Sequence, residues 1–140
     1  MSTFLLEDFP MTEIIPERKE RILDAPILSF NLLSEIEKMK TEIAWKVGTQ
    51  DSKTLLRNPS MKIVLIGLHP GAKIMPHSSE GVLSLVILEG KIKIRTERET
   101  VNLNEGQLLT LHEKTMYEVR AMEESFLLLT VALDKYNQGE

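Results

Sequence analysis

The pattern of apolar and polar positions changes character near residue 53. From there to residue 133, apolar residues occur in short runs separated by glycine, proline, asparagine and acidic residues. The strands predicted from these runs are 53–57, 61–68, 74–77, 82–88, 91–95, 100–103, 108–111, 116–121 and 126–133. Short strands at this spacing are typical of a sandwich or a barrel. The pattern therefore predicts an all-β fold.

Two neighbouring runs show the strand pattern most clearly. Residues 91–95 alternate between a basic residue and isoleucine, the period of two expected for a strand with one buried face. Residues 82–88 are apolar on both faces apart from Ser84, so we expect this strand to be covered on both sides. Gly90 lies between the runs, where glycine permits a tight turn. The two runs are therefore predicted to form a deeply buried hairpin.

One helical pattern precedes the strands. Its apolar residues recur at spacings of three and four and are Leu32, Ile36, Met39 and Ile43. This spacing places them on one face of a helix over residues 34–45. Ser34 and Glu37 have the spacing of a capping box, in which each side chain binds a free backbone N–H group of the first turn.

The residues before this helix are predicted to be an N-terminal arm. Residues 1–26 carry mixed charge and Pro10, Pro16 and Pro26. The apolar residues of the arm are Phe4, Leu5, Leu6, Phe9, Ile14 and Ile15. They are too many for a solvated tail, so we expect the arm to dock on its own domain or on a partner subunit. The predicted organisation is an arm and helix over 1–52, a barrel over 53–133 and a tail over 134–140.

The composition limits the cellular compartments and the classes of binding partner that can be expected. The formal net charge is -4 and basic residues form only short pairs, which argues against a nucleic acid or an anionic membrane as partner. The absence of cysteine excludes disulfides, thiolate metal sites and a cysteine nucleophile. The sequence begins without the basic region of a signal peptide, and its apolar runs are shorter than a membrane span. We therefore expect a cytoplasmic protein.

The candidate metal ligands and acid–base groups are the histidines His69, His77 and His112. None has the His-x-His or His-x-x-x-His spacing of a local metal site. His69 and His112 fall in predicted turns, where solvent exposure is expected. His77 follows Pro76, which holds the preceding residue extended, and it precedes a polar loop. A pocket residue and an ordinary turn histidine both remain open for His77.

Strand parity adds a tyrosine to the candidates. In the strand 116–121, Tyr117 shares a face with Val119, whereas Glu118 and Arg120 share the other face. Because the charged face should meet water, Tyr117 should point inward, near His77. An inward phenol needs a hydrogen-bond partner, which is either a ligand or the protein itself.

Residues from about 55 to 133 resemble the cupin superfamily, which is marked by two sequence motifs, and the first motif is matched in part. Gly71, His77 and Gly90 stand at the glycine, first histidine and closing glycine of that motif. Ser79 and Leu83 stand where the motif has a second histidine and a glutamate.

The second cupin motif is matched in part as well. Gly106 stands at its first glycine, whereas His112 and Thr115 occupy the proline and glycine positions of its turn. Tyr117 stands at the histidine position. The spacing of both motifs is thus kept, while three of the four positions that hold a metal in cupins carry other residues.

The resemblance implies a cupin-type antiparallel β-barrel (jelly roll), with the N-terminal arm and one short helix outside it. It also implies a ligand-binding pocket inside the barrel, bearing His77, Ser79, Leu83 and Tyr117. A transition metal needs several converging donors, so with His77 as its one weak candidate ligand we expect no firmly bound metal and no cofactor. Because cupins commonly pair, the resemblance implies a homodimer.

Three functions remain open at this point. The first is a metal-free module that binds an unidentified small molecule. The second is a cupin enzyme, either a metal-dependent dioxygenase or isomerase or one that uses His77 and Tyr117 as acid and base. The third is a dimeric structural protein without a ligand. The replaced metal ligands favour the first function over a metalloenzyme, so binding is expected rather than catalysis.

Overall fold

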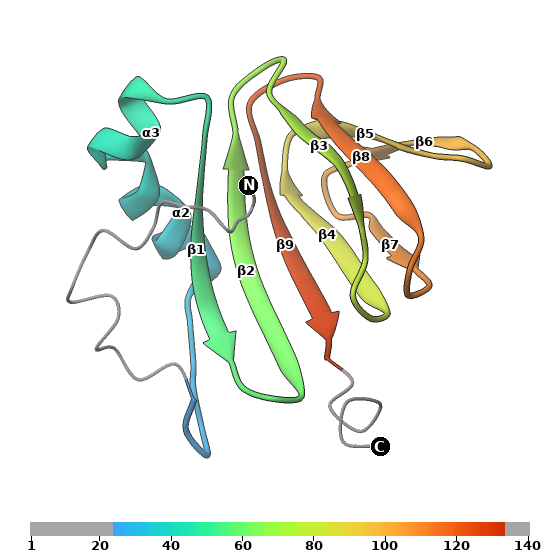
Figure 1. Ribbon diagram of the computed structural model, residues 1–140. Coiled ribbons are helices and arrows are strands. Elements are labelled where there is room, and N and C mark those ends of the chain that lie inside the picture. The colour runs from blue at the N-terminus through green and yellow to red at the C-terminus, as the bar shows by residue number, and fades with distance from the viewer. Residues whose placement is uncertain (1–23, 134–140) are drawn as a thin grey trace.

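The computed structural model describes residues 24–133, which form two antiparallel sheets that lie face to face (Figure 1). The larger sheet has the strand order β1-β2-β9-β4-β7 and the smaller sheet has the order β3-β8-β5-β6. The strands are β1 Gln50–Arg57, β2 Met61–Leu68, β3 Lys73–Ser78, β4 Leu83–Glu89, β5 Lys91–Thr96, β6 Thr100–Asn104, β7 Leu108–Leu111, β8 Met116–Ala121 and β9 Ser125–Ala132. Each overlaps one of the predicted strands, although β1 begins at Gln50 rather than at residue 53. The predicted all-β antiparallel fold is confirmed.

The predicted hairpin of residues 82–88 and 91–95 is wrong. Strand β4 pairs with β7 and β9 in the larger sheet, whereas β5 pairs with β6 and β8 in the smaller one. Gly90 therefore lies at the point where the chain passes from one sheet to the other. Its φ is 97°, and a Cβ atom there would clash with the Ser125 hydroxyl and the Glu124 carbonyl. Both backbone conformation and space thus require glycine at this position.

Apolar side chains from both sheets line the space between them and form one core. The buried members of this core are Val64, Ile66, Leu68, Ala72, Leu83, Leu85, Ile87, Ile92, Ile94, Leu103, Tyr117, Val119, Ala121, Leu127 and Val131. Along β4 they alternate with the half-buried Ser84, Val86 and Leu88, which lie on the outer face. The expected cover of this strand on both sides is therefore only partial within the described residues.

A second apolar cluster lies on the outer face of the larger sheet, under helices α2 (Leu32–Lys40) and α3 (Ile43–Val47) (Figure 1). Its buried members are Ile36, Met39, Trp45, Leu55, Leu65 and Phe126. The helix predicted over 34–45 is thus interrupted before Ile43. Because α3 starts a new helical phase, Ile43 is 74% exposed and Trp45 takes the buried position.

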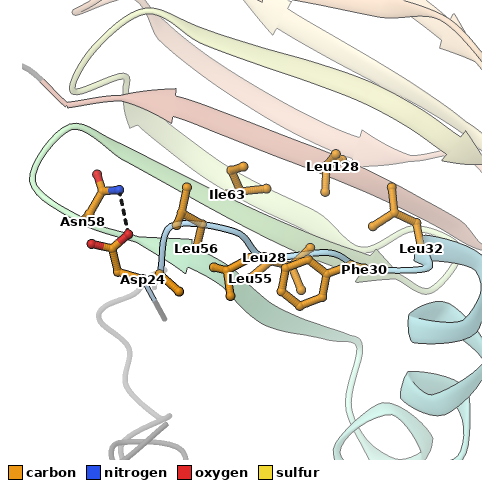
Figure 2. A pocket seen from close by; sticks show the side chains of 10 residues that line it. Asp24, Leu28, Phe30, Leu32, Leu55, Leu56, Asn58, Ile63 and Leu128 are labelled. Atoms are coloured by element: carbon orange, nitrogen blue, oxygen red, sulfur yellow. Dashed lines mark hydrogen bonds between the residues drawn. The ribbon is translucent and has the colours of Figure 1, made fainter. Parts of the chain in front are cut away.

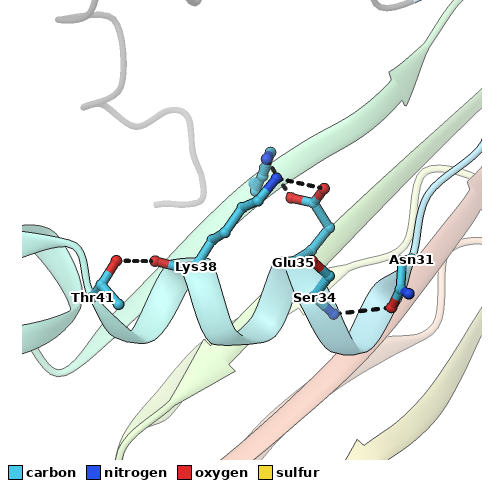
Figure 3. Close-up of polar contacts among 6 residues, drawn as sticks. Asn31, Ser34, Glu35, Lys38 and Thr41 are labelled. Carbon is cyan, nitrogen blue, oxygen red and sulfur yellow. Dashed lines mark hydrogen bonds and ion pairs between the residues drawn. The ribbon is translucent and has the colours of Figure 1, made fainter.

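The first turn of α2 is capped differently from the prediction. The side-chain oxygen of Asn31 accepts a hydrogen bond of 3.0 Å from the N–H of Ser34, so Asn31 is the N-cap (Figure 3). Ser34 therefore lies inside the helix. Glu35, one residue further on, forms an ion pair with Lys53 and so ties α2 to β1. The predicted position of the helix outside the barrel is correct.

The predicted docking of the N-terminal arm falls on residues 1–23, and the predicted tail on residues 134–140, both outside the described residues. Within residues 24–133, no helix is long and apolar enough to cross a membrane.

Candidate functional site

Strand β8 places Tyr117 on the inner face of the smaller sheet. Tyr117, Val119 and Ala121 are buried, whereas the alternate residues Met116 and Arg120 are exposed. Tyr117 is 6% exposed and belongs to the core between the sheets. The inward direction predicted from strand parity is therefore confirmed.

His77 stands directly opposite Tyr117 in the ladder between β3 and β8. On the other side of β8, Tyr117 is paired with Thr96 of β5. The predicted neighbourhood of His77 and Tyr117 is thus present in the backbone register. The side chain of His77 lies outside what the structure describes, so its role remains a prediction.

Ser79 and Leu83 bring no suitable metal donor to this part of the barrel. Ser79 is 3% exposed, and its hydroxyl donates a hydrogen bond to the carbonyl of Gly81. Its N–H donates to the Thr115 carbonyl at 3.2 Å, which joins the loop after β3 to the loop before β8. Leu83 is 2% exposed and has an alkyl side chain. Neither residue supplies the imidazole or carboxylate that a divalent transition metal prefers.

The surroundings of Tyr117 keep its phenol neutral. Burial raises the pKa of Tyr117 to about 12, and the negative charge of Glu80 acts in the same direction. A protonated phenol donates or accepts a hydrogen bond but is a weak metal ligand. No three His, Asp or Glu side chains among those described in residues 24–133 lie close enough together to hold a metal ion. The described residues at the cupin motif positions therefore do not fit the metal site of metal-binding cupins.

The other two histidines lie in different surroundings. His69 was expected to be exposed, but it is half-buried and stacks on Trp45 with the ring centroids 3.7 Å apart. Its Nε2 lies 2.7 Å from the Trp45 carbonyl, which can only accept a hydrogen bond, so Nε2 carries the proton. His112 is exposed, as predicted.

An open hollow of about 210 Å³ lies where β5 ends and β8 begins. Its lining residues are Arg95, Thr96, Glu97, Met116, Tyr117 and Glu118. Tyr117 therefore contributes to both the core and this hollow. At its rim, Arg95 donates a hydrogen bond of 2.7 Å to Glu118, and this bond is the main reason that the pKa of Glu118 is lowered.

A larger hollow, of about 430 Å³, lies outside the barrel, and we call it the outer hollow (Figure 2). Its lining residues are Asp24, Ala25, Leu28, Phe30, Leu32, Leu55, Leu56, Asn58, Ile63 and Leu128. Sequence reasoning missed it because it forms between the chain before α2 and the outer face of β1, β2 and β9. The apolar residues of 27–33 were the one available signal, and they were assigned to the arm and the helix.

Among known proteins, only solved structures are found to be similar to this chain. Neither a protein-family model nor a curated protein matches the chain. A conserved protein of unknown function from Streptococcus pyogenes is similar, with 29% identity, a TM-score of 0.58, and 61% of this chain and 75% of that chain covered. An RmlC-like cupin from Desulfovibrio desulfuricans is 26% identical with a TM-score of 0.55, and 59% of this chain and 81% of that chain are covered.

A third solved structure supports the fold alone. It is an RmlC-like cupin with a double-stranded β-helix fold from Methanocaldococcus jannaschii, with 17% identity, a TM-score of 0.59, and 66% of this chain and 87% of that chain covered. Its fold name describes the two facing antiparallel sheets found here. Gly71, Gly90 and Gly106, the glycines of the cupin motifs, all have positive φ in this chain. Its topology, its glycines and these likenesses show that the chain has the double-stranded β-helix fold of the cupin structures it resembles.

Proposed function

We propose that this cupin-fold protein binds a small organic molecule beside Tyr117, inside the barrel, without the help of a transition metal. The observation that carries the proposal is a neutral phenol, 6% exposed, on an otherwise apolar inner wall. A mostly apolar surface with a few converging polar groups is the usual composition of a small-molecule site. The matching ligand has an apolar body and one hydrogen-bonding group.

Four residues form the proposed site, and each has its own role. Tyr117 gives the ligand a directional hydrogen bond, and His77, opposite it in the ladder, is the second polar group. Leu83 supplies apolar contact. Ser79 acts indirectly, because its hydroxyl is engaged by the Gly81 carbonyl and its backbone holds the loop beside Tyr117.

Binding is favoured over acid–base catalysis by the pKa of Tyr117. A general acid or base works best when its pKa lies near the pH at which the enzyme operates. Burial raises the pKa of Tyr117 to about 12, so the phenol hardly ionises at neutral pH. A hydrogen bond to a bound molecule requires no ionisation, and this is the role that we assign.

A second copy of the chain is the partner that we propose for the uncovered part of the larger sheet. One apolar residue from each of four adjacent strands forms a row on its outer face: Leu65 of β2, Leu128 of β9, Val86 of β4 and Leu108 of β7. The row ends at Leu108 on the edge strand β7, where that side chain is 60% exposed. Its outer neighbours Ser84 and Thr110 are uncharged. A two-fold contact between two copies would remove the accessible end of this row, the half-buried Val86 and the exposed Leu108, from water.

The small-molecule proposal is tested by a thermal-shift screen of uncharged molecules that have an apolar body and one hydrogen-bonding group. Tyr117→Phe keeps the ring and removes the hydroxyl, so a hit should bind it roughly 3- to 10-fold more weakly than the wild type. Tyr136→Phe, which changes the only other tyrosine, is the matched control and should leave the shift unchanged. If Tyr117→Phe and His77→Ala both keep every ligand-induced shift, the proposed site is wrong.

A further inference from the structure

We propose that the outer hollow is the docking site of the chain's own N-terminal segment, and that residues Phe4–Phe9 fill it. The outer hollow lies on the opposite side of the larger sheet from the core that contains Tyr117. This inference therefore stands or falls independently of the proposed small-molecule site.

The outer hollow has apolar walls that the described residues leave in contact with water. On one wall Leu28 is 38% exposed and Phe30 is 39% exposed, although both face the sheet (Figure 2). Leu56, Ile63 and Leu128 form the opposite wall, and each is only half-buried. Facing apolar walls of this kind are stabilised by an apolar occupant that displaces water.

A bulge in β1 builds part of this surface. Thr54 pairs with Val64 and Leu56 pairs with Ile63, so Leu55 is the extra residue between two consecutive pairs. Successive residues of a regular strand point to opposite faces, but a bulge changes this alternation. Leu55 and Leu56 consequently both line the outer hollow. The irregularity thus adds apolar surface at the place where the occupant is needed.

The N-terminal segment starts at the rim of the outer hollow. The described chain begins at Asp24, a lining residue whose carboxylate accepts a hydrogen bond of 3.3 Å from the Asn58 side chain. Figure 2 shows this pair at one end of the hollow and Leu32 at the other end. Residues 24–32 line that length and span at most about 30 Å, whereas residues 10–23 can span up to about 50 Å. The tether is therefore long enough for residues 4–9 to turn back into the hollow.

The composition of residues 4–9 matches the hollow. The apolar members of this run are Phe4, Leu5, Leu6 and Phe9. Phenylalanine and leucine remove large apolar areas from water when they are buried. A tethered segment also has a high effective concentration, so it outcompetes a free ligand or a second copy of similar intrinsic affinity. The chain's own segment is thus favoured over the other occupants.

A cysteine pair tests the placement directly, because the chain contains no cysteine of its own. In the variant Leu5→Cys with Leu56→Cys, mild oxidation should form a disulfide within one chain. The matched control is Leu5→Cys with Val47→Cys, whose second site is 79% exposed and thus more accessible. We expect the first pair to react faster by roughly tenfold or more.

The other outcomes of this experiment overturn the proposal. Equal rates in the two pairs mean that residue 5 has no preferred site at the hollow. A disulfide between two chains, seen as a dimer on a denaturing gel, assigns the hollow to the segment of another copy. A faster reaction of Ile14→Cys with Leu56→Cys assigns it to a different part of the arm.

Deletion of residues 1–12 provides a second measurement that needs no new side chain. We expect the Tm to fall by roughly 5 °C and the fluorescence of an apolar dye to increase, because the hollow becomes empty. A peptide of residues 1–12, added in excess, should reverse both effects. An unchanged Tm with equal dye binding by the full chain contradicts the proposal.

Discussion

Tyr117 shows how one strand position determines a side chain's chemistry. The period of two along residues 116–121 was enough to predict that it points inward, because Glu118 and Arg120 occupy the opposite face. The raised pKa could not be read from the pattern, because it depends on burial by residues from both sheets and on Glu80. The consequence is a phenol that stays protonated at neutral pH.

The pH dependence of stability tests this description of Tyr117. The folded chain keeps the phenol proton up to a pKa of about 12, whereas the unfolded chain releases it near 10, so stability is lost as the pH rises through this interval. Below pH 10 the contribution is complete, and at high pH its loss is on the order of 2–3 kcal/mol. Urea unfolding across this range should show a steeper decline for the wild type than for Tyr117→Phe. Parallel declines would contradict a buried, neutral phenol.

Other residues show where sequence reasoning stops. The positions of Ser79 and Leu83 were set by motif spacing, but the bond from the Ser79 hydroxyl to the Gly81 carbonyl depends on how the loop folds. His69 was assigned to an exposed turn from its local sequence. Its partner Trp45 lies far away in the chain, and a contact of that kind leaves no local pattern.

The strands were predictable as elements, but their assignment to the two sheets was not. Each strand has a local pattern of its own, so the predicted and observed ranges overlap. The choice of partners depends on residues distant in sequence, which is why β4 and β5 were expected to pair and instead lie in different sheets. The outer hollow was missed for the same reason, since it joins the chain before α2 to three strands.

A position can require glycine because its φ is positive or because a neighbouring segment lies too close for a Cβ atom, and two glycines of this chain separate these reasons. Gly90 and Gly106 both have positive φ, at 97° and 86°, but a Cβ atom would clash with β9 only at Gly90. Gly106→Ala should therefore cost about 1 kcal/mol through backbone strain alone. Gly90→Ala should cost roughly 2–4 kcal/mol because the corner between the sheets must also move. Urea unfolding compares the two variants, and equal losses would show that the close approach at Gly90 is unimportant.

The larger sheet organises the whole molecule, because its two faces and its edge have different partners. Its inner face forms the core with the smaller sheet, and its outer face is covered by α2 and α3 near β1 and β2. The remaining outer surface continues toward β7, where no described strand follows. This asymmetry is the reason to expect a second copy of the chain at that end.

Substitution of Leu108 tests the proposed dimer. Because Leu108 is already 60% exposed, Leu108→Glu should change the stability of the fold little. It places a charge in the apolar contact, so dimerisation should weaken by at least about tenfold. Met122→Glu, at a site that is 48% exposed in the turn before β9, is the control. Sedimentation at micromolar concentration should show a dimer for the wild type and the control; a monomeric wild type would contradict the proposal.

We propose above all that the Tyr117 side of the barrel binds an organic molecule without a metal. It is tested most directly by native mass spectrometry of the full chain, mixed with a hit from the thermal-shift screen and dialysed against a chelator. We expect a mass equal to the chain plus the organic molecule, and a weaker signal of this species for Tyr117→Phe. A mass equal to the chain plus one zinc, iron, manganese or nickel ion, or binding that disappears with the chelator, would contradict it.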